Sequence, residues 1–230
     1  MTTQNEKPTI VFVHGLWADG SCWNKVIAEL QAKGYETVSA QNPTTSLSDD
    51  VTAVKRAMDR VKGPIILVGH SWGGMVITQF ADDPRIKGLV YIAAQAPDKD
   101  ETTNTLLKSV PANHLNDYLV TINGFITLSK EGMEKGFAQD LSKEDQMILF
   151  ATQAPAGAVA FDDKSASPAW KVKPTWYILT KRDETVPPQL QKNMATRAKA
   201  KITELDANHV VMLSKPKEVT KVILEAAGSI

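Results

Sequence analysis

A short glycine-rich turn between two apolar runs is the feature that most constrains how this chain folds. The run 65–68 is typical of a buried strand, and the run 75–81 is typical of a helix. Between them, residues 69–74 read Gly-His-Ser-Trp-Gly-Gly. Glycines two residues before and after the serine let the strand and the helix approach closely, and the serine must then adopt a strained backbone conformation. The pattern predicts a tight turn that holds the Ser71 hydroxyl at the end of a sheet; the alternative is a glycine-rich loop at an ordinary strand–helix junction.

Strands and helices alternate on both sides of this turn. Repeated strand–helix units require a parallel sheet that is covered by helices on both faces. We therefore predict an α/β fold with a mostly parallel sheet of about six strands. Two serines, Ser48 and Ser142, are expected to cap helices at their N-termini. The expected strands are 9–13, 37–40, 65–68, 88–94, 176–180 and 201–205.

The alternation is interrupted over residues 97–170, a stretch that is too long for a loop. We expect an inserted cap there, mainly helical, before the second-last strand of the sheet. The predicted organisation is a core domain made of residues 1–96 and 171–230, with a cap made of residues 97–170. Inside the cap, residues 124–128 are expected to form a strand that pairs with the residues after Gly132.

Composition and charge exclude several classes of protein. Hydrophobic residues make up 43% of the 230 residues and charged residues 23%, as in ordinary soluble globular proteins. The 26 basic and 26 acidic side chains balance, so no basic surplus favours nucleic acid or an anionic membrane as a partner. The single cysteine, Cys22, excludes an internal disulfide framework and a cysteine-based metal cage. The polar stretch 1–9 lacks the features of a secretion signal, and no run approaches the ~20 apolar residues of a membrane span, so we expect a cytoplasmic protein.

A serine hydroxyl becomes a good nucleophile only when a base removes its proton, and imidazole suits this role near neutral pH. The chain has four histidines. His70 lies next to Ser71 but on the opposite side of the turn, His14 is expected to order the first loop, and His114 lies in the predicted cap. His209 follows the last predicted strand, and we therefore expect it to be the base. The alternative is a histidine that is hydrogen-bonded in the core.

A catalytic histidine needs a carboxylate that holds its tautomer and stabilises the imidazolium. Asp183 follows the predicted strand 176–180 and is the expected partner of His209. Glu184 and Asp206 are the rivals, and an aspartate in a polar turn is the plain alternative. Ser71, Asp183 and His209 all follow strand ends, where parallel sheets place their ligands.

An oxyanion hole needs two N–H groups that are already in position. The residue after the serine, Trp72, supplies one N–H. The second is expected from Leu16, because Gly15 allows the backbone to turn at the end of the first strand. Trp17 is expected to line the site or to pack behind it.

Taken together, these residues resemble the α/β-hydrolase superfamily over essentially the whole chain. The chain order Ser, Asp, His is that of this family and of no other serine hydrolase fold. Within the family, the chain is similar to the small branch that includes plant methylesterases, hydroxynitrile lyases and bacterial esterases. The resemblance implies ester hydrolysis through an acyl-enzyme, with no cofactor and no metal. It rests on His14-Gly15 with Trp23 soon after, and on the segments 69–74, 183–187 and 207–209.

Three positions bear on the reaction that the resemblance implies. The hydroxynitrile lyases of that branch have a lysine directly after the catalytic histidine, where this chain has Val210, and a threonine where this chain has Gly15. Both differences favour hydrolysis over cyanohydrin cleavage. Epoxide hydrolases and haloalkane dehalogenases have an aspartate where this chain has Ser71, which disfavours them.

The sequence therefore predicts a serine carboxylesterase that acts on a small-molecule ester, as a monomer or a homodimer. Two alternatives remain: the same triad could serve a carbon–carbon lyase or a cofactor-free oxygenase, or the fold could be a small-molecule receptor. An apolar substrate pocket is expected under the cap, although residues such as the cap candidates more often serve packing than substrate contact. The candidates are Trp17, Phe125, Phe137, Met147, Phe150, Val186 and Val210.

Overall fold

The computed structural model describes residues 6–112 and 114–230, and residues 1–5 of the polar N-terminal stretch lie outside the described part. Its centre is a six-stranded sheet in which all neighbouring strands are parallel, in the order β2-β1-β3-β4-β8-β9. The predicted α/β fold with a parallel sheet is confirmed. The strands are β1 (Thr9–Val13), β2 (Thr37–Ser39), β3 (Ile65–His70), β4 (Ile86–Ile92), β8 (Thr175–Thr180) and β9 (Lys201–Leu205).

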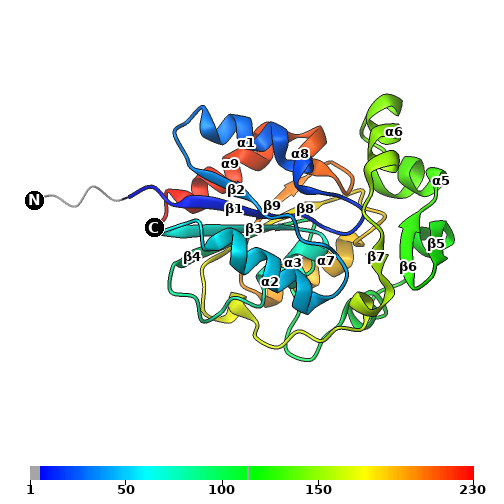
Figure 1. Cartoon of the computed structure of the whole chain (residues 1–230), viewed down its shortest axis with the longest axis horizontal. Coiled ribbons are helices and arrows are strands. Elements are labelled where there is room, and N and C mark those ends of the chain that lie inside the picture. Colours follow the sequence, from blue (N-terminus) through cyan, green and yellow to red (C-terminus); the bar gives the residue numbers. More distant parts are fainter. Residues whose placement is uncertain (1–5, 113) are drawn as a thin grey trace, which may run out of the picture.

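Helices cover both faces of this sheet (Figure 1). One face carries α1 (Asn24–Gln31), α8 (Val211–Ser214) and α9 (Pro216–Ala227), and the other carries α2 (Leu47–Met58), α3 (Trp72–Ile77) and α7 (Pro188–Arg197). A short 3-10 helix, η1 (Gly20–Trp23), precedes α1. The N-cap expected at Ser48 is wrong: α2 begins one residue after Ser46, whose side chain accepts a hydrogen bond from the Asp49 N–H.

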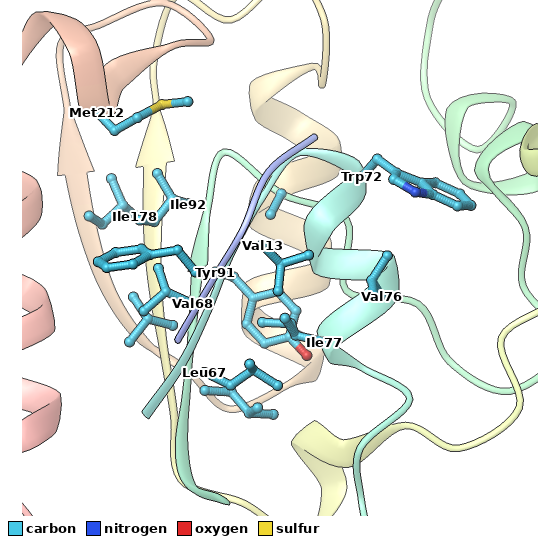
Figure 2. Packing of buried hydrophobic residues seen from close by; sticks show 14 of the residues in the cluster. Val13, Leu67, Val68, Trp72, Val76, Ile77, Tyr91, Ile92, Ile178 and Met212 are labelled. Atoms are coloured by element: carbon cyan, nitrogen blue, oxygen red, sulfur yellow. The ribbon is translucent and has the colours of Figure 1, made fainter. Parts of the chain in front are cut away.

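The core lies between the sheet and these helices. The strands β1, β3 and β8 are almost completely buried, because helices pack on both of their faces. Figure 2 shows Val76 and Ile77 of α3 in the same cluster as Val13 of β1 and Leu67 of β3. No helix in the described part of the chain is long and apolar enough to cross a membrane.

Residues 97–170 connect β4 to β8 and contain strands as well as helices. Three short strands form a second, antiparallel sheet in the order β5-β6-β7. The strands are β5 (Leu119–Ile122), β6 (Phe125–Leu128) and β7 (Ala156–Gly157), and the helices are α4 (Thr103–Leu107), α5 (Lys130–Gly132) and α6 (Lys143–Thr152). Shorter turns of helix are η2 (His114–Tyr118), the π-helix η3 (Met133–Phe137), η4 (Ala158–Phe161) and η5 (Ala169–Lys171).

The expected pairing inside this segment is wrong, although its strand is present. Strand β6 pairs with β5, which precedes it, and the residues after it form helix α5. The turn between β5 and β6 is Asn123-Gly124, and both residues have positive φ, as two-residue hairpin turns require. The expected cap at Ser142 is confirmed, because its hydroxyl accepts a hydrogen bond from the Asp145 N–H at the start of α6.

Candidate active site

Ser71 lies in a tight turn between β3 and α3. Its backbone has φ 53° and ψ −123°, a left-handed conformation that is strained for any residue with a side chain. A Cβ at Gly69 would lie 2.6 Å from the carbonyl oxygen of Gly73, and a Cβ at Gly73 would lie 2.3 Å from the carbonyl oxygen of Val13. Only glycine therefore allows strand and helix to approach this closely, and the tight turn predicted from sequence is present.

Asp183 and His209 form a buried hydrogen-bonded pair at the carboxyl ends of the neighbouring strands β8 and β9. His209 Nδ1 lies 2.8 Å from Asp183 Oδ2. The side chains of both residues are completely buried. Because a carboxylate only accepts, Nδ1 carries the hydrogen and Nε2 is left as the acceptor nitrogen. The carboxylate also accepts hydrogen bonds from the N–H groups of Thr185 and Val186, the hydroxyl of Thr180 and the amide of Gln191.

His209 lies close to the turn that carries Ser71. His209 Nε2 is buried and has no hydrogen-bond partner among the described residues. The ring of His70, the residue before Ser71, lies 4.5 Å from the His209 ring, and His70 Nε2 donates to the His209 carbonyl oxygen at 3.0 Å. Phe137 covers His209 from the cap side, with ring centroids 5.1 Å apart. The His209 imidazole is thus held next to the turn that carries Ser71, and its Nε2 has no hydrogen-bond partner among the described residues.

Two backbone N–H groups near Ser71 are free to bind an anion. Trp72 is the first residue of α3, where a helix leaves its N–H groups unpaired. In the described part of the chain, neither the Trp72 N–H nor the Leu16 N–H donates to another group. The loop that carries Leu16 packs closely against Ser71, because a Cβ at the preceding residue, Gly15, would lie 2.6 Å from Ser71 Cβ.

A family model described as the alpha/beta hydrolase family matches residues 10–222 of this chain. The chain belongs to the α/β-hydrolase family. Among its relatives, Probable hydrolase R7 of Phoma sp. is 25% identical, over 96% of this chain and 99% of its own length. Methylesterase 7 of Arabidopsis thaliana is 24% identical, over 97% of this chain and 98% of its own length.

A solved structure, that of polyneuridine aldehyde esterase, has the same fold. It superposes with a TM-score of 0.83 at 21% identity, over 96% of this chain and 99% of that one. The fold and the family resemblance predicted from sequence are therefore confirmed. The relatives named as a hydrolase and a methylesterase also support an ester-hydrolysing enzyme of the α/β-hydrolase type.

The candidate substrate residues of this α/β hydrolase fall into two groups. Trp17 is buried at positive φ, and its indole N–H donates to the Ile126 carbonyl oxygen of β6 at 2.9 Å, which joins the first loop to the cap. Its ring meets Phe137 edge-on at 6.1 Å. These contacts bring Trp17 and Phe137 to the site, and substrate contact by either stays a prediction. Val186 and Val210, which adjoin the Asp183–His209 pair in sequence, are buried as well.

The other candidates lie further out in the cap. Phe125 and Met147 have exposed side chains, and Phe150 is half-buried. Among the described residues, no hydrogen bond or ring contact joins any of the three to the Asp183–His209 pair. A role in substrate binding for them stays a prediction.

A buried carboxyl that sequence reasoning missed supports the Trp72 side chain. Asp50 of α2 is fully buried and accepts hydrogen bonds from the Trp72 indole N–H at 2.7 Å, the Thr44 N–H at 2.7 Å and the Asn42 amide at 3.1 Å. Desolvation raises the pKa of Asp50, and these donors act against the rise. Figure 2 shows the Trp72 side chain projecting from the start of α3, on the side of that helix opposite Tyr91, and it is itself fully buried.

The burial of His14 and His70 predicts that acid destabilises the fold of this hydrolase. Burial lowers the pKa of His14, and burial followed by the neighbouring His209 lowers the pKa of His70 well below its usual value. Below about pH 6.5 the unfolded chain therefore binds protons that the native state does not, and the free energy of unfolding falls as the pH drops. Each histidine contributes at most about 1.4 kcal/mol per pH unit.

Urea unfolding at pH 7, 6 and 5 measures this slope. We expect the slope of the free energy of unfolding against pH to flatten in the His70→Gln variant, because its side chain does not titrate. His114→Gln is the matched control, since the His114 side chain is exposed. Equal slopes in the wild type and in His70→Gln would contradict the prediction.

Proposed function

We propose that this protein is a serine carboxylesterase that cleaves a small ester through an acyl-enzyme on Ser71. The observation that carries the proposal is the buried Asp183–His209 pair, in which Nδ1 is bound to the carboxylate and Nε2 has no hydrogen-bond partner among the described residues. Catalytic hydrogen bonds are often long or poorly aligned before substrate binds, and they tighten in the complex. The free Nε2 is therefore suited to receive the Ser71 proton.

The proposed reaction has two halves. Ser71 Oγ attacks the ester carbonyl while His209 Nε2 takes its proton, and the resulting oxyanion is bound by the N–H groups of Leu16 and Trp72. The C–O bond to the leaving group then breaks, and His209 returns the proton to the leaving alcohol. Water attacks the acyl-enzyme with the same histidine as base, which releases the acid and restores the serine. Asp183 holds His209 in the tautomer that both halves need.

The surroundings of the site favour hydrolysis of a compact ester. Ser71 is only 6% exposed and His209 is fully buried, so little of the site is open to solvent. Position 15 also separates this chain from the lyases that carry threonine there, because any Cβ at Gly15 would collide with Ser71. Similarity to a methylesterase over nearly the full length points to the same class of reaction.

Ester turnover and active-site labelling test the proposal together. We expect the wild-type protein to hydrolyse p-nitrophenyl acetate and butyrate and to form one adduct with a fluorophosphonate probe, located at Ser71 by peptide mass spectrometry. Labelling of Ser71 without ester turnover would contradict an esterase and favour a receptor. The absence of both results would favour a lyase or an oxygenase that uses His209 without the serine nucleophile.

A further inference from the structure

One carboxylate of the cap binds the residue that precedes His209. Asp140 lies between η3 and α6. Its Oδ2 accepts a hydrogen bond from the Asn208 backbone N–H at 2.6 Å, and its Oδ1 accepts one from the Asn208 side-chain amide at 2.6 Å. Two short bonds to one residue fix both the backbone and the side chain of Asn208, directly beside His209.

The same carboxylate also reaches the loop that carries Asp183. Asp140 Oδ1 accepts a hydrogen bond from Arg182 Nη2 at 2.9 Å, and Arg182 precedes Asp183. The backbone N–H of Arg182 donates in turn to the Ala207 carbonyl oxygen at 3.0 Å. Asp140 is therefore the shared partner of the two loops whose side chains form the buried Asp183–His209 pair.

Two cap residues that precede Asp140 in the chain also contact the region around Asp183 and His209. The Gly136 carbonyl oxygen accepts a hydrogen bond from the Thr185 hydroxyl at 2.9 Å, and Phe137 packs on the His209 ring. Gly136 and Phe137 belong to η3, which is a π-helix. Short π-helical turns occur frequently at functional sites. Residues 136–140 thus contact the loop that carries Asp183, the loop that carries His209 and the His209 imidazole itself.

We propose that Asp140 is a positioning residue, which sets the place of His209 through Asn208 and so makes the catalytic geometry depend on the docked cap. This inference rests on the proposed esterase function. Bonds from donors to an ionised carboxylate are the strong ones, and the Asp140 side chain is only 15% exposed. A displacement of about 1 Å at a catalytic group can lower a rate by 10²-fold.

Asp206 provides a matched control. It binds Arg182 from the other side, with its Oδ1 2.8 Å from Nε, but its side chain is 71% exposed. An exposed ion pair of this kind contributes little. Asp206→Asn removes a carboxylate from the same arginine and leaves both bonds from Asn208 to Asp140 in place.

The test compares Asp140→Asn, Asp140→Glu and Asp206→Asn. In Asp140→Asn one of the two accepting oxygens becomes an NH2 group, which cannot accept a hydrogen bond from Asn208. We therefore expect kcat for p-nitrophenyl butyrate to fall by about 10- to 100-fold with little change in KM. Asp140→Glu keeps the carboxylate and should recover part of the loss, and Asp206→Asn should retain the wild-type kcat. The thermal midpoint of each variant shows whether the fold is intact.

A second readout does not depend on turnover. The hydrogen that His209 Nδ1 donates to Asp183 is expected to give a far-downfield proton resonance, which should shift or broaden in Asp140→Asn but not in Asp206→Asn. An unchanged kcat and resonance in Asp140→Asn, or an equal loss in Asp206→Asn, would overturn the proposal. If Asp140→Asn does not fold, Asn208→Ala deletes one of the two bonds from the other side and is judged by the same criteria. If the wild type cleaves no ester, the esterase proposal fails and the resonance alone decides the role of Asp140.

Discussion

Replacement of Ser71 by alanine is expected to lower kcat for p-nitrophenyl butyrate by at least about 10³-fold, because no other group can form the acyl-enzyme. Alanine keeps the Cβ that serine has, so the strained backbone at position 71 and the packing of the turn should be unchanged. The free N–H groups of Leu16 and Trp72 remain and should sustain only a small residual rate.

Steady-state kinetics of the two proteins measure the loss, with thermal unfolding as the control for an intact fold. Fluorophosphonate labelling should disappear in Ser71→Ala for the same reason. A variant that keeps most of the wild-type turnover would rule out Ser71 as the nucleophile. That outcome would leave His209 as the reacting group and favour a lyase or an oxygenase.

The parallel sheet could be predicted because its central strands, β1, β3, β4 and β8, are almost completely buried. Runs such as 65–68 are apolar without a break, and a glycine-rich turn marks where that strand ends. Strand boundaries were less certain. The fourth strand, expected at 88–94, is Ile86–Ile92, because Ala93 adopts a positive φ of 45° and ends the strand although its side chain is apolar.

The cap was harder to predict, because its strands are short and half-exposed. Strand β5 reads Leu-Val-Thr-Ile and lacks the continuous apolar pattern of the main sheet. The turn Asn123-Gly124 is a typical hairpin turn and would have indicated the correct partner for β6. Strand β7 has two residues and is held by tertiary contacts, so no local pattern indicates it.

The sequence located the candidate triad because Ser71, Asp183 and His209 each follow a strand of one parallel sheet. The supporting residues Asp50 and Asp140 were missed for a physical reason. Each is an ordinary acidic residue in the sequence, and only tertiary packing supplies its donors. Asp50 gave one signal: it lies in the buried stripe of α2 at helical spacing. The other members of that stripe are Leu47, Val54 and Met58.

Replacement of Asp183 by asparagine is expected to lower kcat by about 10³- to 10⁴-fold, close to the loss at Ser71. Asp183 can only accept a hydrogen bond from His209 Nδ1, which leaves Nε2 free to take the serine proton. An amide can donate to Nδ1 instead, and the hydrogen then moves to Nε2, where it blocks the base. The N–H groups of Thr185 and Val186 bind the other oxygen, Oδ1, and hold the side chain in place, so the shape of the site should persist.

Asp206→Asn separates this explanation from a general loss of negative charge, because Asp206 lies in the same loop as His209 and is one of the two rival candidates. Its carboxylate binds the exposed side of Arg182 and is itself 71% exposed, so the variant should retain wild-type kcat. The two variants differ from the wild type by the same single charge, and kcat on one ester is measured for both. If Asp206→Asn lost the activity and Asp183→Asn kept it, the carboxylate that serves His209 would be Asp206, and the buried pair would have a structural role only.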